Sequence, residues 1–235
     1  MKSSRTTTAC SKIPAAKDTY LPGGALISTL GKWCRRVIAS GSDDMGRWVW
    51  QKLIVKGGRK IQLISAYRDS QKSMPGPTTA YTQEYKMLQD MGHSDPHPRN
   101  KSIIDLTNHI KQATNSNEEI ILALDANEDI LPKEVPGPKH DIMTLMKDTN
   151  LIDVYEYQHN QKGDTSRRNT KKIDHVLISH NLLSAVKHSG FLPWNQIMEY
   201  DHCTGFADFA KTELFGETHR RPHPQFIAEN LYRIS

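Results

Sequence analysis

The chain has 235 residues, of which 37% are hydrophobic and 24% charged. These proportions are typical of a globular protein that is long enough to bury a core without stabilising disulfides. No run reaches the roughly 18 consecutive apolar residues that span a bilayer, and the opening residues contain no apolar segment of the kind found in signal peptides. A small disulfide-built protein is therefore excluded, and we expect a protein without a membrane-spanning segment that is intracellular, nuclear or cytoplasmic.

The positive charge is concentrated in the first quarter of the chain. The formal net charge is +5, from 31 Lys and Arg against 26 Asp and Glu. Residues 1–60 hold 12 of the basic residues and only 3 Asp, whereas residues 61–235 hold 19 basic and 23 acidic residues. A basic region can bind the phosphates of a nucleic acid, and it can equally be a solvated surface, so charge alone leaves both interpretations open.

The first predicted elements are short strands. Apolar or alternating runs bounded by glycine-rich turns predict four β-strands, over residues 25–30, 37–40, 48–55 and 61–66. Adjacent glycines separate the last two runs, and they supply the positive φ angles that a tight hairpin turn needs. We therefore expect an antiparallel meander.

After Tyr67 the hydrophobic period becomes helical. The spacing predicts helices over residues 78–91 and 102–113, then a buried strand over 118–124. A further helix ends near residue 150, and strands are predicted over 151–155, 172–179 and 204–209. Antiparallel strands followed by strands interleaved with helices indicate a mixed-sheet α/β sandwich. We place this domain at residues 21–210, between a polar lead at 1–20 and a C-terminal tail at 211–235.

Acidic and amide side chains stand at the ends of the apolar segments. They are Asp125 and Asn127, Asp174, and the pair Asp201 and His202. Sites in α/β sheets are assembled at strand ends, where a carboxylate remains accessible to a ligand. An Asp can deprotonate a water, an Asn can hold that water, and an imidazole beside a carboxylate can transfer a proton. Each pattern alone is more often structural, so the prediction depends on their combination and order.

Basic residues accompany these segments. We assign to a phosphate backbone the residues Arg68, Lys162, Arg167, Arg168, Lys171 and Lys172. Most of them lie in the loop that leads into the Asp174 strand, where a solvated loop is the equal alternative.

The order of the motifs resembles that of the endonuclease/exonuclease/phosphatase superfamily. This superfamily includes DNase I-like enzymes, apurinic/apyrimidinic endonucleases and retrotransposon endonucleases. The resemblance covers about residues 21–210, and the Asp125 motif is closest to the retroelement form. The motifs that carry it are Gly23-Gly24 at a strand start, Tyr67 at a strand end, Asp125-Ala126-Asn127, Thr165 before Ile173-Asp174-His175, and Asp201-His202.

The resemblance implies a DNase I-like sandwich that performs metal-assisted phosphodiester hydrolysis. On this analogy, Tyr67 contacts the scissile phosphate, Asp125 prepares the attacking water and Asn127 holds it. The ion is expected to be Mg²⁺, with Mn²⁺ as the alternative, because carboxylate and water ligands suit a hard cation. DNA is the expected substrate, and RNA is the alternative polymer.

The same resemblance assigns roles to the last motif. Asp201 would help to bind the divalent ion. His202, oriented by Asp174, would contact or protonate the phosphate as negative charge builds on it.

Two departures from the family pattern shape the prediction. The family carries an Asn and a metal-binding Glu before its Gly-Gly strand, whereas residues 1–20 here contain neither Asn nor Glu. Tyr200 stands where the family has a Ser, and His175 stands where it has a Tyr. We therefore expect a domain that lacks its first strand or strands and exposes a sheet edge. Two alternatives remain: a catalytically inactive remnant, with or without nucleic-acid binding, and a phosphatase for small substrates.

Overall fold

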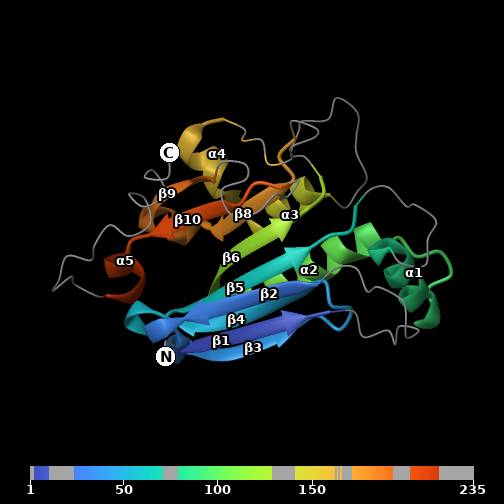
Figure 1. Ribbon diagram of the computed structural model, residues 1–235, viewed down its shortest axis with the longest axis horizontal. Coiled ribbons are helices and arrows are strands. Elements are labelled where there is room, and N and C mark those ends of the chain that lie inside the picture. The colour runs from blue at the N-terminus through green and yellow to red at the C-terminus, as the bar shows by residue number, and fades with distance from the viewer. Residues whose placement is uncertain are drawn as a thin grey trace, which may run out of the picture.

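A computed structural model describes residues 3–10, 24–70, 79–128, 141–161, 163, 165, 171–192 and 202–216. Its centre is a six-stranded mixed sheet in the order β3-β4-β5-β6-β8-β7 (Figure 1). The strands are β3 (Val37–Ser42), β4 (Trp48–Ile54), β5 (Lys60–Tyr67), β6 (Glu118–Asp125), β7 (Leu151–Asp153) and β8 (Asp174–Ser179).

The parallel pair β5–β6 forms the middle of this sheet. Its register runs from Lys60 opposite Glu118 to Tyr67 opposite Asp125. Parallel neighbours need a long crossover, and here the crossover contains the helices α1 (Ala80–Asp90) and α2 (Pro98–Asn115). The other neighbouring strands are antiparallel, and β8 pairs with β6 so that Asp174 lies opposite Asp125. The mixed sheet of the sequence prediction is thus confirmed.

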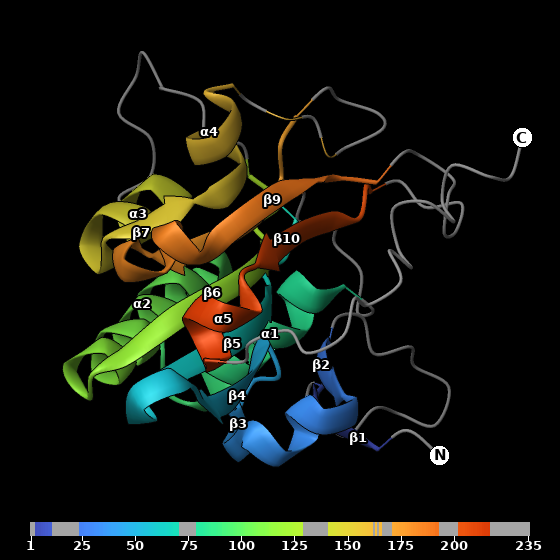
Figure 2. The ribbon, with the colours of Figure 1, turned by 90° about the vertical axis from the view of Figure 1, so that its left-hand side faces the viewer.

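Helices cover one face of the sheet. Side-chain caps fix where they begin: Thr79 accepts a hydrogen bond from the Thr82 amide at the start of α1, and Asp141 accepts one from the Thr144 amide at the start of α3 (Ile142–Thr149). The main core lies between this helical layer and the sheet (Figure 2). Its fully buried members include Ile103, Leu106, Ile110, Ile120, Leu122, Leu145 and Leu177.

The opposite face carries two separate two-stranded sheets (Figure 2). One pairs β1 (Ser4–Ala9) with β2 (Ala25–Leu30), and the other pairs β9 (Val186–Phe191) with β10 (Gly205–Phe209). Each has its own apolar cluster: a small one around Val49 beneath β1–β2, and a larger one around Val154, Leu182 and Leu214. Short helices border these sheets, namely α4 (Val154–His159), α5 (Lys211–Phe215) and the 3-10 helices Gly31–Arg36, Lys56–Gly58 and His180–Ala185.

The structure shortens one predicted strand and shows regular elements within the predicted lead and at the start of the predicted tail. The lead at 1–20 is not only a polar segment, because β1 lies within it and pairs with β2. The predicted strand at 151–155 ends at Asp153, whose side chain caps α4 instead. The tail predicted from residue 211 begins with the helix α5.

Among the described residues, no helix is both long enough and apolar enough to cross a membrane.

Candidate active site

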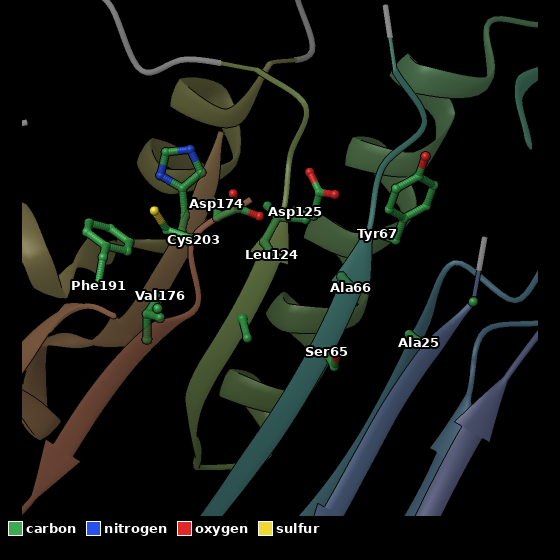
Figure 3. A pocket seen from close by; sticks show the side chains of 14 residues that line it. Ala25, Ser65, Ala66, Tyr67, Leu124, Asp125, Asp174, Val176, Phe191 and Cys203 are labelled. Atoms are coloured by element: carbon green, nitrogen blue, oxygen red, sulfur yellow. The ribbon is translucent and has the colours of Figure 1, made fainter. Parts of the chain in front are cut away.

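The predicted strand-end residues stand side by side at one edge of the central sheet. Tyr67 ends β5 and lies opposite Asp125, which ends β6. Asp125 in turn lies opposite Asp174, which begins the antiparallel strand β8. The carboxyl ends of β5 and β6 therefore meet the amino end of β8, and Figure 3 shows the three side chains around the same opening.

His202 joins this row from a distant part of the chain. Its Nδ1 lies 2.9 Å from Oδ2 and 3.2 Å from Oδ1 of Asp174. Since a carboxylate accepts, the geometry assigns the proton to Nδ1 and fixes the plane of the ring. The orienting role predicted for Asp174 is consistent with this geometry.

Together, Asp125, Asp174 and His202 offer ligands for a cation. One ligand atom from each can be chosen so that all three atoms lie within 4.8 Å of one another. In the part of the chain that the structure describes, this is the group of acidic, histidine and cysteine side chains that meets that spacing. Two carboxylates suit Mg²⁺, whereas an imidazole suits Mn²⁺ and later transition metals better, so the donor set fits either predicted ion.

Burial and neighbouring charge shift the pKa values of Asp125 and Tyr67. Burial, followed by the negative charge of Asp174, raises the pKa of Asp125 to about 6, while His202 acts in the opposite direction. Burial, followed by the charges of Asp125 and Asp69, raises the pKa of Tyr67 to about 12. Asp125 is thus a stronger base than an ordinary carboxylate, and the Tyr67 hydroxyl keeps its proton at neutral pH.

Asn127 holds the loop that follows β6. Its backbone adopts a positive φ of 48°, and its amide N–H donates to Oδ1 of Asp125 at 3.1 Å. Its side-chain Nδ2 donates to the backbone carbonyl of Arg68 at 2.8 Å. The side chain that was predicted to hold a water therefore ties the loops after β5 and β6 together.

Two of the predicted nucleic-acid contacts are buried. Arg68 is 2% exposed and forms an ion pair with Glu128, itself buried. The ammonium group of Lys172 lies 2.7 Å from a carboxylate oxygen of Asp153, and both side chains are 1% exposed. A buried and paired cation is not available to a phosphate, so these two assignments are corrected: Arg68 and Lys172 hold the loops and strands around the site.

The sequence analysis named two motif residues without assigning them the positioning role that the structure shows. Thr165 is fully buried, and its Oγ1 accepts hydrogen bonds from the amides of Ile173 and Asp174 at 2.8 and 3.1 Å. Its carbonyl accepts from the Cys203 amide at 2.9 Å, which ties the segment of His202 to the start of β8. The motif position of Thr165 was a signal for such a role, but its partners were not visible in the sequence.

His175 is the second motif residue whose role was not predicted. It points to the face of β8 opposite Asp174, because side chains alternate along a strand. Its Nδ1 lies 3.0 Å from Oδ2 of Asp153, and its Nε2 lies 3.3 Å from the carbonyl of Glu128. The strand that carries Asp174 is therefore fixed from behind by a buried polar network.

Several predicted site residues lie outside the described residues. These are Asp201, Lys162, Arg167 and Arg168. Of the predicted basic contacts, Lys171 is described and is exposed to solvent.

Tyr67, Asp125 and Asp174 line a cavity of about 380 Å³ between the central sheet and the two small sheets (Figure 3). Its floor comes from β5, β6 and β8, and it is bounded by Gly24 and Ala25 at the start of β2 and by Phe191, Cys203 and Gly205 near β9 and β10.

Comparisons of the fold with solved structures find nucleases. No protein-family model matches the chain, and no curated protein is similar to it in sequence. A 3′ phosphatase, NExo from Neisseria, bound to a product DNA hairpin, superposes with a TM-score of 0.53 and 13% identity over 88% of this chain and 79% of that one. The AP endonuclease from Archaeoglobus fulgidus gives a TM-score of 0.52 and 14% identity, over 88% of this chain and 79% of that one.

The chain has the DNase I-like fold. A structure of the 3′-5′ exonuclease NExo from Neisseria meningitidis agrees, with a TM-score of 0.51 and 14% identity over 88% of this chain and 80% of that one. At such identities the comparison concerns the fold, and it confirms the architecture that the motifs predicted. In this DNase I-like fold, the row of Tyr67, Asp125 and Asp174 lies at the edge of the central sheet.

Proposed function

We propose that this protein is a metal-dependent phosphodiesterase that cleaves DNA internally, in the manner of a retroelement endonuclease domain. The observation that carries the proposal is the group of Asp125, Asp174 and His202 beside a cavity at the sheet edge. Two carboxylates and an imidazole are the side chains needed to hold a divalent ion and to move protons in phosphoester hydrolysis.

The side chains of the row have separate tasks in this proposal. Asp125, with its pKa raised to about 6, is largely ionised at neutral pH and accepts a proton from the attacking water. His202, whose Nδ1 donates to Asp174, presents Nε2 to a phosphate oxygen, and in its doubly protonated form it would give the Nε2 proton to the leaving oxygen and return to the neutral ring. The Tyr67 hydroxyl retains its proton and donates a hydrogen bond to a non-bridging oxygen.

Asp125 and Asp174 would hold Mg²⁺ or Mn²⁺. We retain Asp201, the neighbour of His202 in the sequence, as a further proposed ligand. When bound, the ion supplies positive charge that neutralises the charge developing on the phosphoryl oxygens.

We propose DNA as the substrate, with RNA as the alternative polymer. The DNA hairpin bound to NExo, a protein of the same fold, supports this choice. Lys171 is exposed three residues before Asp174 and would pair with a phosphate near the site. Lys162, Arg167 and Arg168 are retained as further proposed phosphate contacts.

Nicking of covalently closed supercoiled plasmid tests this function. A closed circle has no ends, so an exonuclease or a 3′ phosphatase leaves it intact and only an endonuclease relaxes it. We expect nicking with Mg²⁺ or Mn²⁺, and no nicking with a chelator. Asp125→Asn should reduce the rate at least about 100-fold, since it removes the proposed base.

The matched control is Asp90→Asn, which makes the same chemical change at an exposed position at the end of α1. Retention of nicking by Asp125→Asn at the rate of the control would refute the assignment of the site. A folded protein without metal-dependent nicking would refute the endonuclease.

Phosphomonoester hydrolysis is the second candidate. NExo, a 3′ phosphatase, supports this candidate, because a protein of the same fold then removes a terminal phosphate. Release of phosphate from a 3′-phosphorylated oligonucleotide, with no nicking of the closed circle, would select this activity. Insensitivity of the substrate KM to salt would further indicate a small phosphate ester, because contacts to a polyanion weaken as salt rises.

A further inference from the structure

The positive charge of the first quarter of the chain gathers at one end of the molecule. The 3-10 helix Gly31–Arg36 leads into β3, and the 3-10 helix Lys56–Gly58 connects β4 to β5. Val37 at the start of β3 pairs with Leu53 near the end of β4, so both 3-10 helices lie at the same end of the sheet. We call this surface the basic end, and its cations are Lys32, Arg35, Arg36, Lys56, Arg59 and Lys60. They make up half of the 12 basic residues among the first 60.

Contacts between separate segments make the basic end one surface. The Arg36 guanidinium donates to the Ile54 carbonyl at 3.5 Å and lies 4.9 Å from the centre of the Phe215 ring in α5. The side chain of Lys56 lies against the end of α5, since a side chain at Gly216 would come within 3.3 Å of the Lys56 Cγ. Figure 2 looks at this end of the molecule and shows α5 beside the two 3-10 helices. Cations from two parts of the sequence are thus held next to each other.

Few acidic side chains neutralise the basic end. Glu119 pairs with Arg59 at 3.1 Å, and Glu213 is the acidic residue that α5 and the two 3-10 helices contain. Lys56 and Lys60 are exposed, and neither forms an ion pair with a residue in the described part of the chain. The basic end therefore presents cations to solvent that no carboxylate within the described structure balances.

The acidic residues of the same stretch of chain lie at the opposite end of the sheet. Asp43 and Asp44 follow β3 in the turn that leads to β4, and beside this turn the Tyr67 amide donates to the Arg47 carbonyl at 2.9 Å. Lys60 begins β5, and Tyr67 ends it seven residues later. At about 3.3 Å for each residue, the basic end lies about 23 Å from the candidate site. One phosphate cannot contact both places, so the basic end is a separate surface.

The turn between β4 and β5 leaves its cations accessible. Gly57 and Gly58 stand between Lys56 and Arg59, and they have positive φ angles of 71° and 77°. Within the described structure, no atom lies within 4 Å of the position that a Cβ on either glycine would take. A rod-shaped polyanion can therefore approach the backbone of this turn closely, with cations on both sides of the two glycines. Backbone and cationic groups of this kind are the ones that contact phosphates.

A double helix fits the basic end better than a single strand or a lipid surface. Proteins that bind single strands stack the bases on aromatic rings. Here the rings of Trp33 and Phe215 pack on each other at 4.3 Å, and Nζ of Lys32 lies 4.7 Å from the centre of the Trp33 ring. Proteins that lie on a bilayer insert apolar side chains, and residues 56–60 carry none. A double helix presents one negative charge for about every 1.7 Å of its axis, so cations alone suffice to bind it.

We propose that the basic end binds the backbone of double-stranded nucleic acid, at a surface separate from the candidate site. Lys56, Arg59 and Lys60 pair with its phosphates, and the exposed Arg35 extends the contact along the neighbouring 3-10 helix. Contacts to phosphates carry no sequence information, so this surface binds duplexes of any sequence. The binding goes beyond the proposed function, because it needs neither the group of Asp125, Asp174 and His202 nor a metal ion.

Fluorescence anisotropy with a labelled DNA duplex tests the binding without any activity measurement. The probe spans about two helical turns, or about 20 base pairs, and EDTA is present so that no metal-dependent cleavage occurs. We expect saturable binding of the whole chain that weakens as salt rises. The double variant Lys56→Gln with Lys60→Gln should bind at least about tenfold more weakly at about 50 mM salt. Its slope of log affinity against log salt should be smaller by about two, since each phosphate contact contributes about 0.9.

The double variant Lys86→Gln with Lys147→Gln is the matched control. It removes two exposed lysines from α1 and α3 in the helical layer and lowers the net charge by the same amount. We expect it to leave both the affinity and the salt slope close to those of the unaltered chain. Equal weakening by the two double variants would overturn the proposal, because binding would then follow net charge and not the basic end. The absence of duplex binding by the unaltered chain would overturn it as well.

Three other probes test the class of ligand. They are a single-stranded oligonucleotide of the same length, polyglutamate, and vesicles of equal parts phosphatidylcholine and phosphatidylserine. We expect the duplex to bind more tightly than the single strand or polyglutamate at the same salt concentration. Equal or tighter binding of either polymer, or vesicle binding that Lys56→Gln with Lys60→Gln abolishes, would overturn the assignment to double-stranded nucleic acid. A chain that binds the duplex through the basic end but does not nick plasmid contradicts the proposed endonuclease and supports this inference, so the two failures can be told apart.

Discussion

Replacement of Glu84 by glutamine should change how the stability of the protein depends on pH. Glu84 lies on α1 and is 7% exposed, and its Oε2 has no hydrogen-bond partner in the described part of the chain. Burial, followed by the charge of Asp69, raises its pKa from 4.5 to about 8, although Arg47 acts in the opposite direction. The folded protein therefore prefers a protonated Glu84.

The sign of the effect follows from proton binding. Between pH 4.5 and pH 8, the folded state keeps a proton on Glu84 that the unfolded state releases, so the free energy of unfolding falls as the pH rises through this window. A shift from 4.5 to about 8 corresponds to a loss of up to about 4 kcal/mol by pH 8, at 1.36 kcal/mol for each pKa unit. Glutamine cannot ionise, so Glu84→Gln should lose none of this contribution.

Urea unfolding at pH 5, 6.5 and 8 measures the difference. The advantage in unfolding free energy of Glu84→Gln over the unaltered chain should grow with pH by about 2–4 kcal/mol. Glu213→Gln, at an exposed site on α5, is the control and should show no such growth. A constant difference between Glu84→Gln and the unaltered chain across the three pH values would refute the reasoning, since Glu84 would then be ionised in the folded state.

Three further substitutions test the buried supports of the site. Lys172→Met leaves the charge of Asp153 without its closest cation and should lower the free energy of unfolding by about 3–5 kcal/mol in urea unfolding. Thr165→Val removes the acceptor for two amides and should lower the free energy of unfolding by about 1–3 kcal/mol. In nicking, kcat should fall by a larger factor than KM rises, because Asp174 shifts. Asp174→Asn should weaken Mn²⁺ binding at least tenfold by titration calorimetry, and an unchanged affinity would exclude Asp174 as a ligand.

The strand ends could be predicted because their signals are local. After its first two glutamates, β6 continues as an apolar run over residues 120–124 that is followed by Asp125, and this run indicates both a buried strand and a polar residue at its end. The strand β9, with the sequence VKHSGF, has no comparable apolar alternation, so nothing in its composition marked it as a strand. It forms because β10 pairs with it.

The burial of Arg68 and Lys172 could not be predicted, because their ion-pair partners lie far away in the sequence. Arg68 resembles any strand-end arginine until the fold brings Glu128 to it across 60 residues. Lys172 belongs to the same basic run as Lys171, yet one is buried beside Asp153 and the other is exposed. The sequence shows the charge of a side chain, but only the fold determines whether that charge faces solvent.

The parallel pairing of β5 with β6 has a consequence for how the site comes into being. Tyr67 and Asp125 meet only when two strands separated by α1 and α2 find each other, and His202 reaches Asp174 across a further 28 residues. Contacts between residues so far apart along a chain form late, because the entropy of closing a long loop must be overcome before any contact compensates for it. The acidic group therefore cannot assemble on a partly folded chain. We expect the group of Asp125, Asp174 and His202 to be among the last features to form during folding, after the helical layer has packed on the sheet.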